Sequence, residues 1–292
     1  VYKRQPLGSS RDHEGVDVPS VTGLRAHGRS TPAIGLIVIV ALGVAALVPQ
    51  LRLLVALGFG LGFLLAPAGT AWRWAMAAGL PVALVMAWAT FVADRLVVHP
   101  LDCADLLSPA AWLRAAAALL VSGVVIVLAH NLRTGLRDIG LRRPSRTELW
   151  LGLAAVLLIP VPSLYLGTFL AEPFFGEMTL DLSQPLAILP ALVLAVANGT
   201  MEELAYRGAL MHWLSRAAGP AVGLVGQAVI FGLAHTGSDF TGPMLPVVLT
   251  IMAGGLIAGL IVRMTRSLWL PIVVHICFDI PLYYAAACSQ QG

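Results

Sequence analysis

The chain has 292 residues, of which 58% are hydrophobic and 11% are charged, and its mean hydropathy is +0.86. This composition excludes an ordinary soluble domain and is typical of a membrane protein that crosses the bilayer several times. The net charge of +3 is small, and the sequence has no basic run with interleaved aromatic residues, which excludes nucleic acid as a partner. We therefore expect an all-α fold, a polytopic transmembrane helical bundle.

The N-terminal region is polar. Residues 1–31 show no apolar period, which predicts a disordered tail. Residues 1–5 resemble translated adapter sequence, so we expect them to be artefactual and leave them out of the fold prediction. Residues 32–139 are expected to form accessory N-terminal transmembrane helices, and residues 140–292 form a second transmembrane unit that holds the polar motifs described below.

Apolar segments follow the tail in close succession. A bilayer core of about 30 Å needs about 20 helical residues, and most of the segments meet that length. The first two are short and are separated by Pro49–Arg52, so they form either a tight hairpin or one broken helix. The sequence predicts eight or nine spans. The segments are 33–48, 51–66, 71–93, 110–132, 148–171, 186–213, 219–236, 243–263 and 268–287.

The charges of the loops predict the orientation. If the tail lies in the cytosol, arginine is concentrated in the cytosolic loops and acidic residues in the opposite ones, as the positive-inside rule requires. Arg52 and Arg95 are the exceptions. We therefore expect a multi-pass protein of the plasma membrane with a cytosolic N-terminal tail. The cytosolic loops contain Arg73, Arg133, Arg137, Arg142, Arg143, Arg146, Arg216, Arg263 and Arg266.

An acidic pair interrupts the apolar segment 186–213. An ionisable group at membrane depth is costly and is a functional-site candidate by default. Glu203 and Arg207 lie four residues apart and share a helix face, which predicts an ion pair. Glu202 points about 100° away from Glu203. We therefore expect Glu202 to face a cavity, with Asn198 one turn away to orient it.

Two later segments supply candidate partners. His235 ends the next apolar segment, and His275 precedes Asp279 by four residues, on one face of the last helix. The short turn after the acidic helix makes that helix and the next one antiparallel. Counted from this turn, Glu202 and His235 differ in depth by only about 5 Å, so they can meet. His275 lies nearer the cytosolic end by the same counting, so a tilt or a helix break must bring it to the others.

Three motifs occur in order on these late helices: Glu-Glu-x-x-x-Arg, Phe-x-x-x-His and His-x-x-x-Asp. In this order the motifs resemble the CPBP family, which includes type II CAAX prenyl endopeptidases and bacteriocin-processing or self-immunity proteins of the Abi group. The resemblance covers about residues 140–287 and includes the stretch Ile139–Pro144 before the motifs. It implies a conical helical bundle, a catalytic core in residues 140–292 and intramembrane endopeptidase activity. The compact chain favours a prokaryotic source.

The resemblance also implies residue roles. Glu202 and His235 would activate the attacking water, and His275 and Asp279 would stabilise the oxyanion. Structural support, rather than chemistry, would fall to Glu203 and Arg207.

The mechanistic type is open between a glutamate-type and a metallo-type protease, because the family has also been described as metalloproteases. Zinc needs about three protein ligands and an open position, and Glu202, His235 and His275 are the candidate ligands, although no HExxH spacing is present. Asp279 stands where the family more often has Asn. An ionised carboxylate cannot donate a hydrogen bond to an oxyanion. Asp279 must therefore be protonated, orient His275 or bind the metal.

The chemistry is coherent without the family. Peptide hydrolysis needs a base for water, donors for the oxyanion and a proton for the leaving amine, and a carboxylate with a histidine supplies the first and the third. We therefore predict an endopeptidase that cleaves a membrane-associated or lipidated peptide or protein near the cytosolic face of the lipid bilayer. One alternative is a proton-coupled transporter, since intramembrane carboxylates and histidines also form proton relays, although no inverted repeat is visible. The other is a non-catalytic bacteriocin-immunity or binding protein on the same scaffold.

Overall fold

The computed structural model describes residues 31–90, 107, 109–165, 179–180, 182–236, 244–287 and 289–290. Residues 1–30 of the predicted tail, and Arg95 of the loop-charge analysis, lie outside the described residues.

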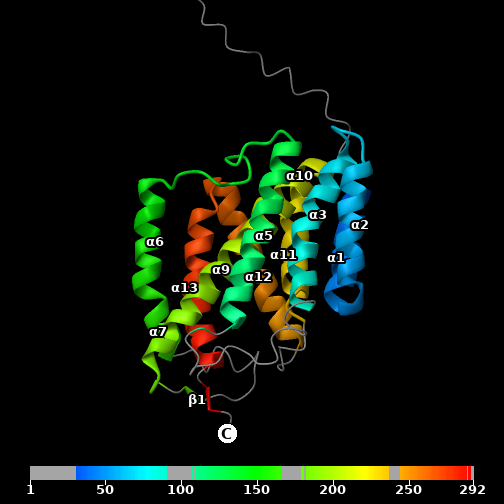
Figure 1. Ribbon diagram of the computed structural model, residues 1–292. Coiled ribbons are helices and arrows are strands. Elements are labelled where there is room, and N and C mark those ends of the chain that lie inside the picture. The colour runs from blue at the N-terminus through cyan, green and yellow to red at the C-terminus, as the bar shows by residue number, and fades with distance from the viewer. Residues whose placement is uncertain are drawn as a thin grey trace, which may run out of the picture.

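The described chain is helical apart from one short strand pair, in which Thr179 opposes Gln290 and Leu180 opposes Ser289. The long helices lie side by side in one bundle (Figure 1). The predicted all-α architecture is therefore confirmed. In chain order the elements are α1 (Pro32–Leu47), η2 (Pro49–Leu51), α2 (Arg52–Leu65), α3 (Ala71–Trp88), α5 (Pro109–Asn131), α6 (Arg146–Leu158), α7 (Pro160–Tyr165), β1 (Thr179–Leu180), η4 (Pro185–Ala187), α9 (Ile188–Glu202), η5 (Glu203–Met211), α10 (His212–Ala218), α11 (Pro220–Leu233), α12 (Met244–Thr265), α13 (Trp269–Ala287) and β2 (Ser289–Gln290).

Four helical stretches of the described chain are long and apolar enough to cross a bilayer, by length and composition. Several further apolar helices of the bundle are shorter than that criterion requires, so the predicted count of eight or nine spans is not confirmed. The four long stretches are Pro109–Asn131, Arg146–Leu164, Pro185–Ala218 and Met244–Thr265.

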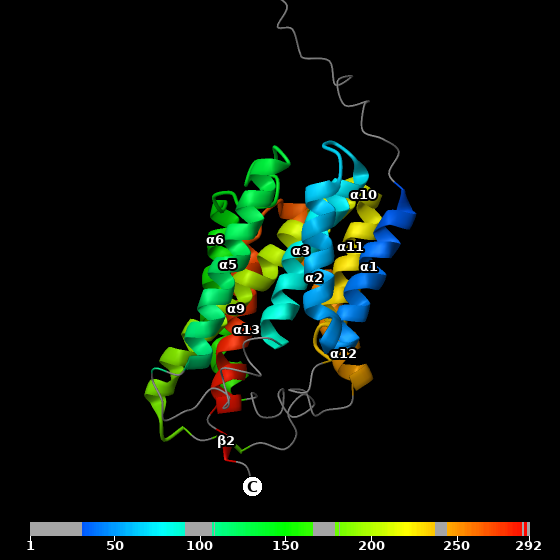
Figure 2. The same cartoon turned by 45° about the vertical axis from the view of Figure 1, so that its right-hand side comes forward.

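The first two helices form the tight hairpin that the sequence left open, because α1 and α2 lie side by side (Figure 2). Arg52 begins α2 and donates from Nε to the carbonyl of Ala45 at 3.1 Å and from Nη2 to that of Ala46 at 3.3 Å. Its Nη1 donates to Thr90 Oγ1 at 2.6 Å. The last carbonyls of a helix lack intrahelical partners. Arg52 departs from the charge pattern of the loops because it caps α1.

The arginine-rich loops gather at one end of the bundle, the upper end in Figure 1. The backbone N–H of Leu268, between α12 and α13, donates to the carbonyl of Gly140, between α5 and α6, at 3.0 Å. Arg142 donates to the carbonyls of Thr265 and Arg266 at 2.8 and 3.2 Å. These bonds join the two loops. The charge pattern therefore groups the loops correctly, while the side of the membrane that they face stays a prediction.

Helix α6 begins with a capping box at the same end of the bundle. The Oγ of Ser145 accepts from the backbone N–H of Glu148, and Oε2 of Glu148 accepts from the backbone N–H of Ser145. The same Glu148 oxygen accepts from Arg142 Nη2 at 2.8 Å. Two donors that the helix start would leave unsatisfied are thereby paired, and the α5–α6 loop is fixed above the bundle.

The acidic pair lies on a long central helix that runs through α9, η5 and α10. The segment η5 is π-helical, and π-helical turns inside α-helices occur frequently at functional sites. Helices α5 and α13 pack against α9, and α11 packs against η5. A single cluster of buried apolar side chains includes residues from α1, α3, α5 and η5. The hydrophobic core is therefore continuous across the predicted division at residues 139 and 140, and that division stays a prediction.

Candidate active site

The acidic pair spans the point where α9 gives way to the π-helical η5. Glu202 is the last residue of α9 and Glu203 the first of η5, and both are buried. Nη1 of Arg207 donates to Oε1 of Glu203 at 2.9 Å, which confirms the predicted ion pair. The Arg207 guanidinium also lies over the ring of Phe231, 4.1 Å from its centroid. An aromatic ring from α11 therefore covers one face of the Arg207 guanidinium.

His275 of α13 binds the same Glu203 oxygen. Its Nδ1 lies 2.9 Å from Oε1 of Glu203. An ionised carboxylate only accepts, so the imidazole donates from Nδ1. One carboxylate oxygen thus holds both Arg207 and His275. The sequence analysis assigned Glu203 to Arg207 alone, and no spacing rule could reveal a partner 72 residues away.

The other nitrogen of His275 faces two carboxylates. Nε2 lies 3.7 Å from Oε2 of Glu202 and 3.7 Å from Oδ1 of Asp279. Both distances exceed the usual range of a direct hydrogen bond, which ends near 3.2 Å. His275 therefore stands between Glu202 and Asp279, fixed through one ring nitrogen and poised between two acids at the other.

A glycine allows His275 to reach this depth. A Cβ at Gly199 would lie 3.1 Å from Cγ1 of Ile276 and 3.5 Å from Cβ of His275. The separation from Ile276 is tight and that from His275 is an ordinary van der Waals contact, so the missing side chain lets α13 approach α9 closely. Small residues serve this purpose where membrane helices meet. Helix α13 is continuous from Trp269 to Ala287, so the expected break is absent, and the expected tilt stays a prediction.

Asn198 contacts the far side of the cluster. Its Nδ2 donates to Oδ2 of Asp279 at 2.9 Å, and both side chains are buried. The sequence analysis placed Asn198 beside Glu202 as its orienting partner, and the hydrogen bond goes to Asp279 instead. Oε2 of Glu202 has no hydrogen-bond partner among the described residues.

His235 follows the end of α11. Its Nδ1 lies 2.7 Å from the carbonyl oxygen of Phe231. A carbonyl only accepts, so Nδ1 donates and Nε2 of the neutral ring is an acceptor. Glu202 and His275 both lie close enough to interact electrostatically with this ring. The arrangement therefore groups Glu202, His235 and His275, as the sequence analysis expected.

The Phe231 ring organises the two histidines. It meets His235 edge-on with 4.9 Å between ring centroids, and His275 edge-on with 6.1 Å. Tyr206 of η5 packs against the same ring at 5.0 Å. Edge-to-face contacts in this range are favourable. The Phe of the Phe-x-x-x-His motif thus contacts His235, His275 and the Arg207 guanidinium.

Sequence reasoning missed Arg114. This half-buried residue lies on α5, in the unit predicted to be accessory. Its charge contributes to the electrostatic surroundings of Asp279, His235 and Tyr283. The signal was available, because an arginine inside the apolar segment 110–132 is an intramembrane cation and marks a functional candidate.

The described residues contain no group of three or more His, Cys, Asp or Glu side chains arranged to hold a metal ion. The predicted zinc ligands Glu202, His235 and His275 include one, His275, whose Nδ1 is bound to Glu203, so its Nε2 is the nitrogen that could bind a metal. The three do not converge as a ligand set in this geometry. Zinc binding stays a prediction.

The fold and the site define a class: a helical membrane protein with buried carboxylates and imidazoles brought together from separate helices. The family model described as Type II CAAX prenyl endopeptidase Rce1-like matches residues 184–281. The match includes Glu202, His235, His275 and Asp279, and it confirms the resemblance to CAAX-type intramembrane proteases of the CPBP family. No curated protein and no solved structure matches the chain.

Proposed function

We propose that the protein is an intramembrane endopeptidase in which Glu202 and His235 activate a water molecule. The observation that carries this proposal is the difference between two adjacent carboxylates. Oε1 of Glu203 binds the Arg207 cation and His275, while Oε2 of Glu203 has no partner among the described residues. Oε2 of Glu202 is buried, lacks a hydrogen-bond partner among the described residues and lies 3.7 Å from His275 Nε2. Among the described residues an arginine pairs with Glu203 and none pairs with Glu202, so we assign the role of proton acceptor to Glu202.

The base acts in two steps. Glu202 accepts a proton from the water as the water oxygen attacks the scissile carbonyl carbon. The neutral His235, whose Nε2 is an acceptor, shares in this proton transfer. The proton then moves to the leaving amine as the carbon–nitrogen bond breaks. A positioned base or acid of this kind contributes about 10²- to 10⁴-fold to the rate.

His275 supplies the donor for the developing oxyanion. Glu203 holds its Nδ1, which aims Nε2 toward the space beside Glu202. When the ring is protonated, Nε2–H donates to the oxyanion, and such a preorganised donor in a site without bulk water is a large contribution to catalysis. Asp279 accepts from Asn198, so we assign it to positioning and charge balance around His275 rather than to oxyanion donation.

The substrate class follows from the family and the setting. The matched family is named for prenylated CAAX chains. We propose a membrane-associated or lipidated peptide or protein that enters from the arginine-rich end of the bundle, with that end and the N-terminal tail in the cytosol and the protein in the plasma membrane. Zinc held by Glu202, His235 and His275 is the alternative way to activate the water.

The test compares purified wild-type protein with Glu202→Gln and, as a surface carboxylate control, Asp138→Asn. Cleavage of a farnesylated CAAX peptide and of an unlipidated peptide library is measured with and without a zinc chelator. We expect Glu202→Gln to lose at least about 100-fold in kcat/KM at an unchanged thermal unfolding midpoint, and the control to keep its activity. Undiminished cleavage by Glu202→Gln would overturn the assignment.

The other outcomes separate the alternatives. Inhibition by the chelator that zinc restores would make Glu202 a metal ligand rather than a free base. Failure of the wild-type protein to cleave, together with Glu202-dependent proton flux in liposomes, would replace proteolysis by transport. Failure of both assays would leave the non-catalytic immunity scaffold.

A further inference from the structure

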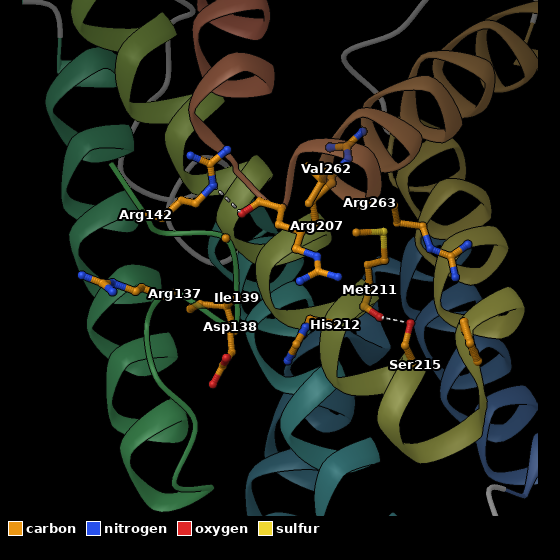
Figure 3. A pocket seen from close by; sticks show the side chains of 13 residues that line it. Arg137, Asp138, Ile139, Arg142, Arg207, Met211, His212, Ser215, Val262 and Arg263 are labelled. Carbon is orange, nitrogen blue, oxygen red and sulfur yellow. Dashed lines mark hydrogen bonds between the residues drawn. The ribbon is translucent and has the colours of Figure 1, made fainter. Parts of the chain in front are cut away.

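A second feature lies at the arginine-rich end, away from the carboxylate cluster. A cavity of about 490 Å³ opens between the α5–α6 loop, the junction of η5 with α10, and the end of α12 (Figure 3). None of Glu202, His235, His275 or Asp279 lines it. Its charged lining consists of Arg137, Asp138, Arg142, Arg207, Arg263 and Arg266.

The charge of this cavity is largely uncompensated. Arg142 is bound to Glu148, and Arg207 to Glu203. Within the part of the chain that the structure describes, Arg137, Arg263 and Arg266 form no ion pair with a carboxylate. Oδ2 of Asp138 accepts from the backbone N–H of Gly135 at 2.9 Å. Three exposed guanidinium groups therefore share one cavity with one carboxylate.

A buried donor at the base of the cavity also lacks a partner. The Arg207 side chain is 1% exposed, and its Nε makes no hydrogen bond with any described residue. Figure 3 shows the guanidinium between the α5–α6 loop and His212, whose Nε2 is likewise without a partner there. A buried donor that is left without an acceptor destabilises the fold. An anion that reaches this depth would supply the missing acceptor.

The surroundings of the cavity indicate where the anion comes from. Ile257, Leu260 and Met264 lie on one face of α12, and 59%, 43% and 85% of their respective surfaces are exposed. This apolar stripe ends next to Arg263, at the mouth of the cavity. A free phosphate has no apolar group that could pack against this stripe, whereas the acyl chains of a lipid would cover it. Basic cavities between membrane helices are suited to lipid head groups.

We propose that this cavity binds the phosphate head group of an anionic lipid, with the acyl chains along the exposed face of α12. Arg137, Arg263 and Arg266 bind the phosphate oxygens, because the planar guanidinium matches phosphate with paired hydrogen bonds. The deepest oxygen accepts from Nε of Arg207. The site shares Arg207 with the Glu203 ion pair but contains none of Glu202, His235, His275 and Asp279, so its test does not require peptidase activity.

The test uses the full chain purified in a neutral detergent. Binding of phosphatidylglycerol, phosphatidylcholine and glycerol 3-phosphate is measured by native mass spectrometry and by the shift of the thermal unfolding midpoint. The probe variant is R137Q/R263Q, and the matched control is R143Q/R146Q, which removes the same charge from exposed arginines of the same loop region outside the cavity. R137K/R263K keeps the charge and checks that substitution at these positions leaves the fold intact.

We expect phosphatidylglycerol to bind the wild type and the R143Q/R146Q control alike. R137Q/R263Q should bind it about 30-fold more weakly, at about 1 kcal/mol for each arginine near an anionic lipid. Phosphatidylcholine and glycerol 3-phosphate should bind far more weakly than phosphatidylglycerol. Equal losses in the probe and control variants would overturn the site. Equal binding of glycerol 3-phosphate would show a free phosphate as the occupant and overturn the lipid assignment, as would equal binding of phosphatidylcholine.

Discussion

The Nδ1 of His275 and Oε1 of Glu203 are joined by a 2.9 Å hydrogen bond, and the same oxygen accepts from Arg207. The residue that looks like scaffold in the sequence therefore also orients a ring at the centre of the site. Because Glu203 is buried, both donors depend on one carboxylate that water cannot replace. Its removal should affect stability and chemistry in separable ways.

Glu203→Gln should lower both the stability of the protein and its peptide-cleavage activity. Breaking a buried ion pair by removing one partner typically costs about 3–5 kcal/mol, because the other charge is left uncompensated. We expect a clear fall in the thermal unfolding midpoint of the purified protein and a loss of peptide cleavage.

The double variant E203L/R207M separates the two effects. Replacing a buried pair by apolar residues of similar size often restores stability. The unfolding midpoint should therefore recover, while cleavage stays low because Nδ1 of His275 has lost its acceptor. Recovery of cleavage together with stability would show that Glu203 does not position His275.

Asp279 offers a test of its role as an acceptor. Asp279→Asn keeps an oxygen that can accept from Asn198 and adds an amide that can donate to an oxyanion. We expect its kcat to stay within about tenfold of wild type, since one neutral hydrogen bond is worth about 1 kcal/mol. Asp279→Leu leaves the Asn198 amide unpaired and should lose far more activity. If the Asn variant is as inactive as the Leu variant, the negative charge itself is required.

The close contact at Gly199 predicts that a larger residue there would displace α13 and lower activity. An alanine there must push Ile276 of α13 away by a few tenths of an ångström, and His275 is the next residue along that helix. We expect Gly199→Ala to lower kcat while its unfolding midpoint changes little, because alanine favours the helix by about 0.5–1 kcal/mol and offsets part of the strain.

Gly254→Ala is the matched control on α12, where a Cβ would meet nothing within 4 Å. It should keep full activity and gain slightly in stability. Equal activity of the two alanine variants would remove the argument that the α9–α13 contact positions His275.

Arg114 lies on α5, before the segment that matches the family model. Its position near Asp279 and His235 predicts that this earlier helix takes part in the site. Arg114→Gln should reduce kcat/KM by about tenfold, which corresponds to about 1.4 kcal/mol of lost charge stabilisation. Arg114→Lys should retain part of the activity because it keeps the charge. Arg133→Gln, at an exposed loop position, is the comparison. Full activity of Arg114→Gln would confine the site to α9 and later helices.

Local contacts were predictable from the sequence and distant ones were not. The Glu203–Arg207 pair follows from a four-residue spacing, and α12 and α13 lie close to the apolar segments expected there. The Asn198–Asp279 bond depends on how closely α13 crosses α9, which Gly199 allows and which no periodicity encodes.

The number of membrane spans was predicted less well from the sequence. Apolar composition predicted eight or nine spans, but α1 and α11 have 16 and 14 residues, short for a bilayer of about 30 Å. The π-helical turns of η5 also have no mark in an apolar pattern, because burial on all sides removes the polar face that reveals helical phase.

Arg207 belongs both to the ion pair with Glu203 and to the lining of the basic cavity. Its Nη1 binds the carboxylate that holds His275, and its side chain also lines the basic cavity. Thermodynamic linkage requires any coupling between two sites to be reciprocal. Whatever factor an occupant of the cavity adds to the affinity for substrate, the bound substrate must add to the affinity for that occupant. One guanidinium would then let the composition of the surrounding bilayer set how readily the enzyme engages its substrate.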